Sequence, residues 1–137
     1  MVRTTEQPIV QALVSTLRAN LTLKAAISGI HESVAPKGAT YPFLTYDLVA
    51  APYEDDFSAR TIRADWDVWA WARDQVEASN IDQMVMNTLE DSVTVTGQTA
   101  IYLRRIEGLR LTEIDESDQR IYRRGGSYHI ITYQPLA

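Results

Sequence analysis

The stretch of sequence that decides the fold is RADWDVWAWARD, residues 63–74, where three tryptophans stand among acidic residues and alanines. Successive side chains of a β-strand point to opposite faces, so the residues of such a strand divide by parity. One parity is apolar throughout and comprises Ile62, Ala64, Trp66, Val68 and Ala70. The other parity is mixed and comprises Arg63, Asp65, Asp67, Trp69 and Trp71. The pattern predicts a strand over residues 60–72 with one face in the core.

Trp69 and Trp71 lie on the face that the alternation assigns to water, whereas Trp66 is expected in the core. Two large rings on a polar face need a cover. One hypothesis is that a loop or the N-terminal segment of the same chain shields them. The other is a subunit interface, where tryptophan is enriched because one ring excludes much water at little entropic cost. The sequence leaves both hypotheses open.

Helical periodicity predicts further elements on either side of this strand. Apolar residues recur at helical spacing over residues 6–20, with a possible short second helix over 21–27. Another apolar stripe runs over residues 74–90, and Asp74 is placed to cap the start of that helix. The stripe consists of Ile81, Met84, Val85, Thr88 and Leu89. We expect this helix to pack on the apolar face of the predicted strand.

Alternating patterns predict the remaining strands. One strand is expected over residues 43–50, and a longer one over about 101–114, with a bulge near Gly108. A last strand over residues 120–134 completes a hairpin around the turn DESDQR. The order of elements predicts an α+β fold, in which a mostly antiparallel twisted β-sheet carries an N-terminal helix and a central helix on one face.

Length and composition limit the class of protein. A chain of 137 residues fits one domain, residues 1–137, and its formal charge of −5 disfavours DNA binding through a basic patch. The absence of cysteine excludes disulfides, thiolate zinc sites and cysteine nucleophiles. The start of the chain does not resemble a signal peptide and no apolar stretch is long enough to span a membrane, so we expect the protein in the cytoplasm of the cell that makes it.

No motif of catalysis or cofactor binding stands out. His31 and His129 are the only histidines, too few for a multi-histidine metal site, and the acidic residues 54–56 lack the spacing of a calcium loop. Gly125 and Gly126 are not part of a phosphate-binding motif, and we expect them to kink or bulge the last strand. We therefore predict that the protein is not an enzyme, with no cofactor, no metal and no catalytic residue.

The predicted C-terminal hairpin contains a cluster of basic and aromatic residues. Its members are Arg104, Arg105, Arg110, Arg120, Arg123 and Arg124, with Tyr102, Tyr122 and Tyr128. Such a set is compatible with a nucleic-acid-binding sheet, whose affinity would depend steeply on salt. The alternative is salt bridging to nearby carboxylates, which include Glu107 and Glu113. We favour the salt bridges.

Three segments together resemble a known family. They are VQALVSTLRANLTLKAAISGIHESVAPKGATYPFLTYDLV, then DWDVWAWARDQVEASNIDQMVMNTLED, and finally YHIITYQ at the end of the hairpin. In order, length and local character they resemble the tail-completion or tail-terminator proteins of long-tailed bacteriophages. The resemblance covers nearly the whole chain as a single tail-terminator-like α+β domain.

The resemblance implies a structural virion protein of the tail or neck, assembled in the host cytoplasm. Members of that family are small subunits, and the resemblance implies three roles for them. They form a hexameric ring on the last ring of tail-tube protein, stop tube growth and offer a docking surface to the head connector. The implied partners are further copies of the chain, the tail-tube protein and a head-to-tail connector or stopper protein. DNA would pass through the lumen without sequence-specific binding, and no membrane is involved.

Ring formation implies a heterologous interface repeated around the axis. The candidate interface residues are Trp69, Trp71, Tyr102, Arg104, Tyr122 and Arg124. The segment over residues 52–59 is expected to be a long loop that reaches a partner or lines the lumen, where acidic residues would repel DNA phosphates. Its candidate residues are Tyr53, Glu54, Asp55, Asp56 and Phe57.

Other functions stay open at this level. A head-completion or stopper protein of the phage neck would attach to the head in place of the tail tube. A small nucleic-acid-binding sheet is a weaker alternative. A ligand-binding domain or enzyme is disfavoured, because no convergent set of polar residues accompanies the aromatic strand.

Overall fold

The computed structural model describes residues 6–50, 53–55, 59–91 and 99–135. The elements in chain order are α1 (Glu6–Ala19), α2 (Leu21–Ala26), β1 (Ile30–Glu32), β2 (Phe43–Ala50), β3 (Tyr53–Asp55), β4 (Ala59–Ala72), α3 (Gln75–Asp91), β5 (Thr99–Ile114) and β6 (Arg120–Pro135). Both long helices and all four long strands were predicted within a few residues of their ends. No helix in these ranges is long and apolar enough to cross a membrane.

The strands form a single sheet of six strands in the order β1-β2-β4-β6-β5. β3 also pairs with β4, beyond the end of β2, so β2 and β3 follow one another along the same side of β4. Every neighbouring pair is antiparallel except β1 and β2. This architecture confirms the predicted α+β fold with a mostly antiparallel sheet.

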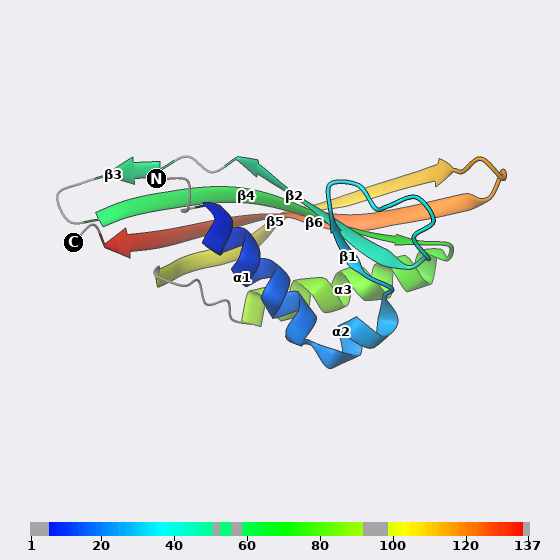
Figure 1. The fold of residues 1–137 in the computed structure, drawn as a ribbon, viewed down its shortest axis with the longest axis horizontal. Coiled ribbons are helices and arrows are strands. Elements are labelled where there is room, and N and C mark those ends of the chain that lie inside the picture. The colour runs from blue at the N-terminus through cyan, green and yellow to red at the C-terminus, as the bar shows by residue number, and fades with distance from the viewer. Residues whose placement is uncertain (1–5, 51–52, 56–58, 92–98, 136–137) are drawn as a thin grey trace.

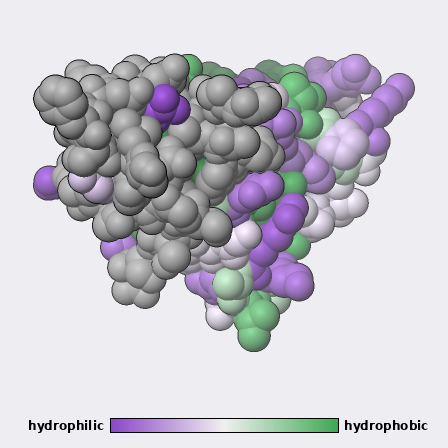
Figure 2. Space-filling model, turned by 60° about the vertical axis from the view of Figure 1, so that its left-hand side comes forward, coloured by the Kyte–Doolittle hydropathy of each residue, from purple (hydrophilic) through white to green (hydrophobic). Residues whose placement is uncertain are grey.

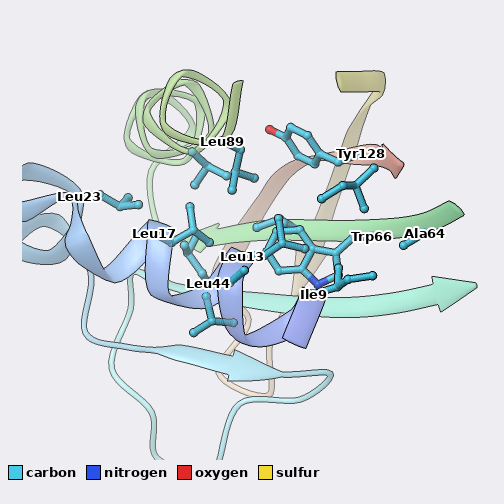
Figure 3. Packing of buried hydrophobic residues seen from close by; sticks show 14 of the residues in the cluster. Ile9, Leu13, Leu17, Leu23, Leu44, Ala64, Trp66, Leu89 and Tyr128 are labelled. Atoms are coloured by element: carbon cyan, nitrogen blue, oxygen red, sulfur yellow. The ribbon is translucent and has the colours of Figure 1, made fainter. Parts of the chain in front are cut away.

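The three helices lie on one face of the sheet (Figure 1). No described helix lies on the opposite face, which is called the uncovered face below. Ile9, Leu13 and Leu17 of α1 point toward Trp66 of β4, while Leu89 of α3 approaches the same core from the side of Tyr128 (Figure 3). All five predicted inward residues of β4 are at most 2% exposed. The alternation of apolar residues in β4 therefore predicted the buried face of this strand correctly.

The end of α3 nearest β4 forms as the sequence predicts. Asp74 precedes the helix, and its Oδ2 accepts a hydrogen bond from the backbone nitrogen of Glu77 at 3.1 Å. This bond satisfies one of the backbone donors that the first turn of a helix leaves free. The cap fixes the point where the chain leaves β4 and turns back over the sheet.

Two sequence-based expectations require correction. Residues 52–59 were expected to form a loop, but Tyr53–Asp55 is the short strand β3 paired with β4. Gly125 and Gly126 were expected to kink or bulge the last strand, but β6 pairs with β4 without a register shift. The register of β5 against β6 shifts twice, between Ala100 and Tyr102 and between Arg105 and Glu107, and the second shift is close to the bulge predicted near Gly108.

The two glycines give β6 room for close neighbours. A Cβ at Gly125 would lie 2.0 Å from the backbone oxygen of Val68 in β4, which is far inside van der Waals contact. A Cβ at Gly126 would lie 2.6 Å from Nε of Arg105, whose side chain crosses that position from β5. Both glycines therefore serve close packing rather than a turn.

Candidate functional site

The uncovered face of the sheet contains an aromatic cluster at the end of β4. Trp71 stacks on Phe43 of β2, with ring centroids 5.6 Å apart and an interplanar angle of 23°, and Tyr41 lies 5.0 Å from Phe43. The indole nitrogen of Trp71 donates a hydrogen bond to Oγ1 of Thr45 at 2.8 Å. Trp71 is therefore anchored within its own chain, although it stays partly exposed.

Arg123 of β6 lies over both tryptophans of this face. Its guanidinium carbon is 4.3 Å from the ring centroid of Trp69 and 4.0 Å from that of Trp71. Its Nη1 also lies 3.0 Å from Oε1 of Glu113 in β5, which completes an ion pair. A cation held over two rings in this way is a favourable contact that partly shields them. The chain thus covers Trp69 and Trp71 in part, and both keep intermediate exposure.

A hollow of about 600 Å³ opens beside Trp71. Its walls are residues 33–39, Tyr41 and Phe43 on one side and residues 114–117 of the β5–β6 turn on the other. Val34 and Ile114 belong to these walls and are 79% and 67% exposed. The aromatic cluster therefore continues into an open apolar surface at this end of the sheet.

Next to the hollow, Arg73 fixes the turn of the hairpin. Its guanidinium lies 4.5 Å from the ring centroid of Tyr41 and forms an ion pair with Asp115 at 2.5 Å. The hydrogen bond from Arg73, followed by that from the backbone of Gln119, holds the pKa of Asp115 below its usual value. Asp115 also accepts a bond from the backbone nitrogen of Ser117. The turn is thus tied to the end of β4.

The middle of the uncovered face carries polar pairs in place of aromatic rings. Nδ1 of His129 lies 2.6 Å from Oδ1 of Asp65, and Oγ of Ser127 donates to Oδ1 of Asp67 at 2.6 Å. Each pair joins β4 to β6 directly across the sheet. The part of the chain that the structure describes holds no group of three or more acidic, histidine or cysteine side chains placed for a metal ion.

The candidate interface residues do not all share one surface. Arg104 is exposed on β5. Tyr102 lies two residues earlier in the same strand, where its backbone pairs with Ile131 of β6. Arg124 is 6% exposed and donates to the backbone oxygens of Leu111 and Arg123. Burial, and then the charge of Arg110, lowers the pKa of Arg124 below its ordinary value.

Tyr122 pairs with Ala72, on the same parity as Arg124 and opposite to Trp71. The structure therefore brings Trp69 and Trp71 together and separates Tyr122 and Arg124 from them. Of the predicted lumen residues, Tyr53, Glu54 and Asp55 form β3, whereas Asp56 and Phe57 lie outside the described residues.

Two contacts of the arginine cluster were not predicted individually. Arg105 donates to both carboxylate oxygens of Asp82 in α3, at 3.1 Å and 2.8 Å, and this pair joins α3 to the sheet. Partial burial works against the charged form of Arg105, but the hydrogen bonds and charge of Asp82 outweigh it and raise its pKa. The pairs Arg105–Asp82 and Arg123–Glu113 agree with the salt-bridging interpretation of the cluster.

The comparisons with known proteins agree with one another. The family model described as tail completion protein gp17 matches residues 11–133. A chain in the virion of a native gene transfer agent particle is 14% identical, with a TM-score of 0.70 over 90% of this chain and 92% of that one. The gp17 protein of bacteriophage SPP1 is 20% identical, with a TM-score of 0.56 over 96% of this chain and 91% of that one. No curated protein matches significantly.

At these identities the two solved structures show the shared fold, while the family model covers most of the chain. The match confirms the family that the sequence resembles. The chain therefore belongs to the tail completion protein gp17 family, and it is a structural protein of the phage virion, in the tail or neck, rather than an enzyme.

Proposed function

We propose that the chain forms a homo-hexameric ring that caps the tail tube, stops tail elongation and joins the tail to the head connector. The observation that carries this proposal is the match to the tail completion family over residues 11–133. A ring requires a heterologous contact, in which one surface of each copy meets a different surface of the next. The uncovered face and the free edges of the sheet offer such surfaces.

The aromatic cluster supports a place for Trp69 and Trp71 in the subunit contact. Both rings stay partly exposed although Arg123 covers them from one side. In the described surface visible in Figure 2, hydrophobic residues stand in small groups among hydrophilic ones. Arg104 and Tyr102 remain in the proposed interface, with Tyr122 at its border. Arg124 is left out because it is buried within its own chain.

The acidic segment over residues 53–57 is proposed to face the lumen or a partner along the ring axis. Glu54, Asp55 and Asp56 are consecutive, and the whole chain has a formal charge of −5. Negative charge on a lumen wall repels DNA phosphates and so keeps DNA from binding during passage. The proposed partners are therefore other copies of the chain, the tail-tube protein and the connector, with DNA passing freely.

The test combines imaging with a tube-growth assay. Negative-stain images of the purified protein are expected to show sixfold rings, and its addition to polymerising tail-tube protein should shorten the tubes in proportion to dose. Trp69→Ala should weaken ring formation while circular dichroism stays unchanged. Leu21→Ala, at a residue that is 76% exposed on the helical layer, is the matched control and should leave assembly unchanged.

Two results would contradict the proposal. Tubes of unchanged length in the presence of rings would remove the capping role. Binding of the protein to the head connector without any affinity for the tube would instead favour a head-completion or stopper protein.

A further inference from the structure

Each side of the sheet has a bulge whose extra residue is β-branched, apolar and exposed. In β2 the register shifts between Leu48 and Ala50, which leaves Val49 without a partner on β4. In β5 the register shifts between Ala100 and Tyr102 and again between Arg105 and Glu107, and the second shift leaves Ile106 without a partner on β6. Val49 is 60% exposed and Ile106 is 59% exposed. Apolar side chains in both positions are unusual, because edge bulges normally accompany charged residues that discourage pairing.

The two bulges flank the same row of the sheet. Leu48 pairs with Trp66, Trp66 pairs with Tyr128, and Tyr128 pairs with Arg105. These four residues form one row across the sheet, with Val49 next to one end and Ile106 next to the other. Copies in a closed ring are related by a rotation without a rise, so positions of equal height on opposite sides can meet.

Both sides of the described sheet offer free backbone at this level. β5 is the outer strand on one side. On the other side β1 covers β2 as far as Tyr46, and the hydroxyl of Ser33 donates a hydrogen bond to the carboxylate of Asp47. Among the described residues no strand pairs with Leu48–Ala50 on this side, and β3 continues the same side of β4. Since each step from β2 to β4, β6 and β5 is antiparallel, β2 and β5 run in opposite directions. Two sheets placed side by side in the same orientation would therefore pair antiparallel.

The charges of the two edges are complementary. The first half of β5, Thr99–Arg105, contains two arginines and no acidic residue, and Arg104 is exposed. The opposite edge contains Asp47, whose carboxylate accepts a hydrogen bond from Ser33, and two acidic residues in β3, and no basic residue. By register, Arg104 is on the row of Ala50, between the level of Asp47 and that of β3.

The bulge at Ile106 also lets β5 of one copy avoid a steric clash with β1 of the next. Glu32 of β1 is on the row of Gly108, so a straight β5 of a neighbouring copy would collide with β1 from that row onward. A bulge bends its strand and increases the local twist. The bulge at Ile106 comes before Gly108 in the strand, so it can direct the second half of β5 away from β1 of the neighbouring copy.

We propose that the partner of the β5 edge is a second copy of this chain. Thr99–Arg105 of one copy adds antiparallel to the edge formed by Leu48–Ala50 and β3 of the next, with Ile106 next to Val49 and Arg104 among the acidic residues. Such a contact is heterologous and closes a ring when repeated. The inference rests on the proposed ring, and specifies which backbone edges join its subunits.

The experiment uses the absence of cysteine from the chain. Val49→Cys and Ile106→Cys are made separately, one of them with a tag, and are oxidised alone and as a mixture with copper phenanthroline. A disulfide requires Cα atoms within about 7 Å, so only edge contact gives the bond. The mixture should yield one-to-one dimers, each variant alone should not, and the double variant should yield a ladder that ends at six copies.

The control variant is Val76→Cys, at a residue that is 63% exposed and belongs to α3 rather than to either edge strand. Mixed with Ile106→Cys, it should give no dimers. A further variant, Ile106→Lys, should weaken ring formation by about tenfold or more with unchanged circular dichroism, which corresponds to about 1.4 kcal/mol.

The outcomes separate the two proposals. Rings that form without a bond between positions 49 and 106 would overturn the edge contact alone. A bond within Ile106→Cys by itself would show two β5 edges facing each other, and would also overturn it. A protein that stays monomeric throughout the micromolar range would overturn both the ring and its edge contact.

Discussion

The two faces of β4 are stabilised by different means. On the helical face, five apolar residues in alternate positions are almost completely buried, among them Trp66 with 0% exposure. On the uncovered face, Trp69 and Trp71 keep part of their surface and are positioned by a stack, a hydrogen bond and the cation of Arg123. Burial of apolar side chains is the main stabilising contribution of β4 on the first face. Directed contacts hold the second while leaving apolar surface available to another molecule.

Truncating one tryptophan on each face tests this contrast most strongly. Trp66→Ala should lower the free energy of unfolding by about 4 kcal/mol, because it removes the largest fully buried side chain and leaves a cavity. Trp71→Ala should cost about 2 kcal/mol, since that ring is already partly hydrated. Urea denaturation followed by circular dichroism measures both values. Equal losses would mean that the uncovered face is as much a core as the covered one.

The adjacent glycines of β6 offer a finer comparison. Gly125→Ala should cost about 3 kcal/mol, because its Cβ would meet the backbone of Val68, which cannot move without disturbing the β4–β6 pairing. Gly126→Ala should cost about 1 kcal/mol, because the side chain of Arg105 can shift away. Thermal unfolding of the two variants, compared with the wild type, gives the order. The reverse order would show that Arg105 is held more firmly than the sheet backbone.

The ion pair between Arg105 and Asp82 tests how α3 is fixed to the covered face. Asp82→Asn should lower the free energy of unfolding by about 2 kcal/mol, since a half-buried guanidinium loses its charged partner. Glu90→Gln, at an exposed position of the same helix, should stay within about 0.5 kcal/mol of the wild type. Chemical denaturation at neutral pH compares the three proteins. A similar effect of both changes would assign the loss to helix charge instead of the ion pair.

The smallest effect at neutral pH is expected from Tyr128→Phe. Among the described residues the buried hydroxyl of Tyr128 makes no well-formed hydrogen bond, so its removal should change the stability by less than about 1 kcal/mol. Burial raises the pKa of Tyr128, so the neutral form stabilises the fold fully below about pH 10, and this contribution is lost as the pH rises further. The wild type should therefore lose more stability above pH 10 than the variant. Parallel curves of stability against pH would disprove the role of this burial.

Local patterns in the sequence were sufficient for most of the fold. The alternation of β4 and the helical stripe of residues 74–90 each depend on neighbours in sequence, so both elements and their buried faces were predicted correctly. β3 was missed because Pro52 and the following acidic residues are typical of a loop, and only pairing with the long β4 makes Tyr53–Asp55 a strand.

The contacts of the candidate site depend on register between distant strands. Arg123 covers Trp69 and Trp71 because β6 pairs with β4 so that Trp71 opposes Arg123, across a separation of about fifty residues. The Arg105–Asp82 pair depends on the register of β5 with β6, in which Arg105 opposes Tyr128, and on the contact of α3 with β5. The alternation within a single strand cannot predict contacts between side chains of distant strands. It did identify Trp69 and Trp71 as large apolar residues on a face that is otherwise polar.

The position of β6 within the sheet has a consequence for synthesis of the chain. β6 is the last described strand, yet it lies between β4 and β5 and pairs with both over nearly its whole length. A ribosome that has not yet released residues 120–135 therefore holds a chain whose longest strands lack their common partner. Subunits become competent for assembly only after residues 120–135 have been synthesised, and a chain that lacks them would expose two long strand edges prone to aggregation.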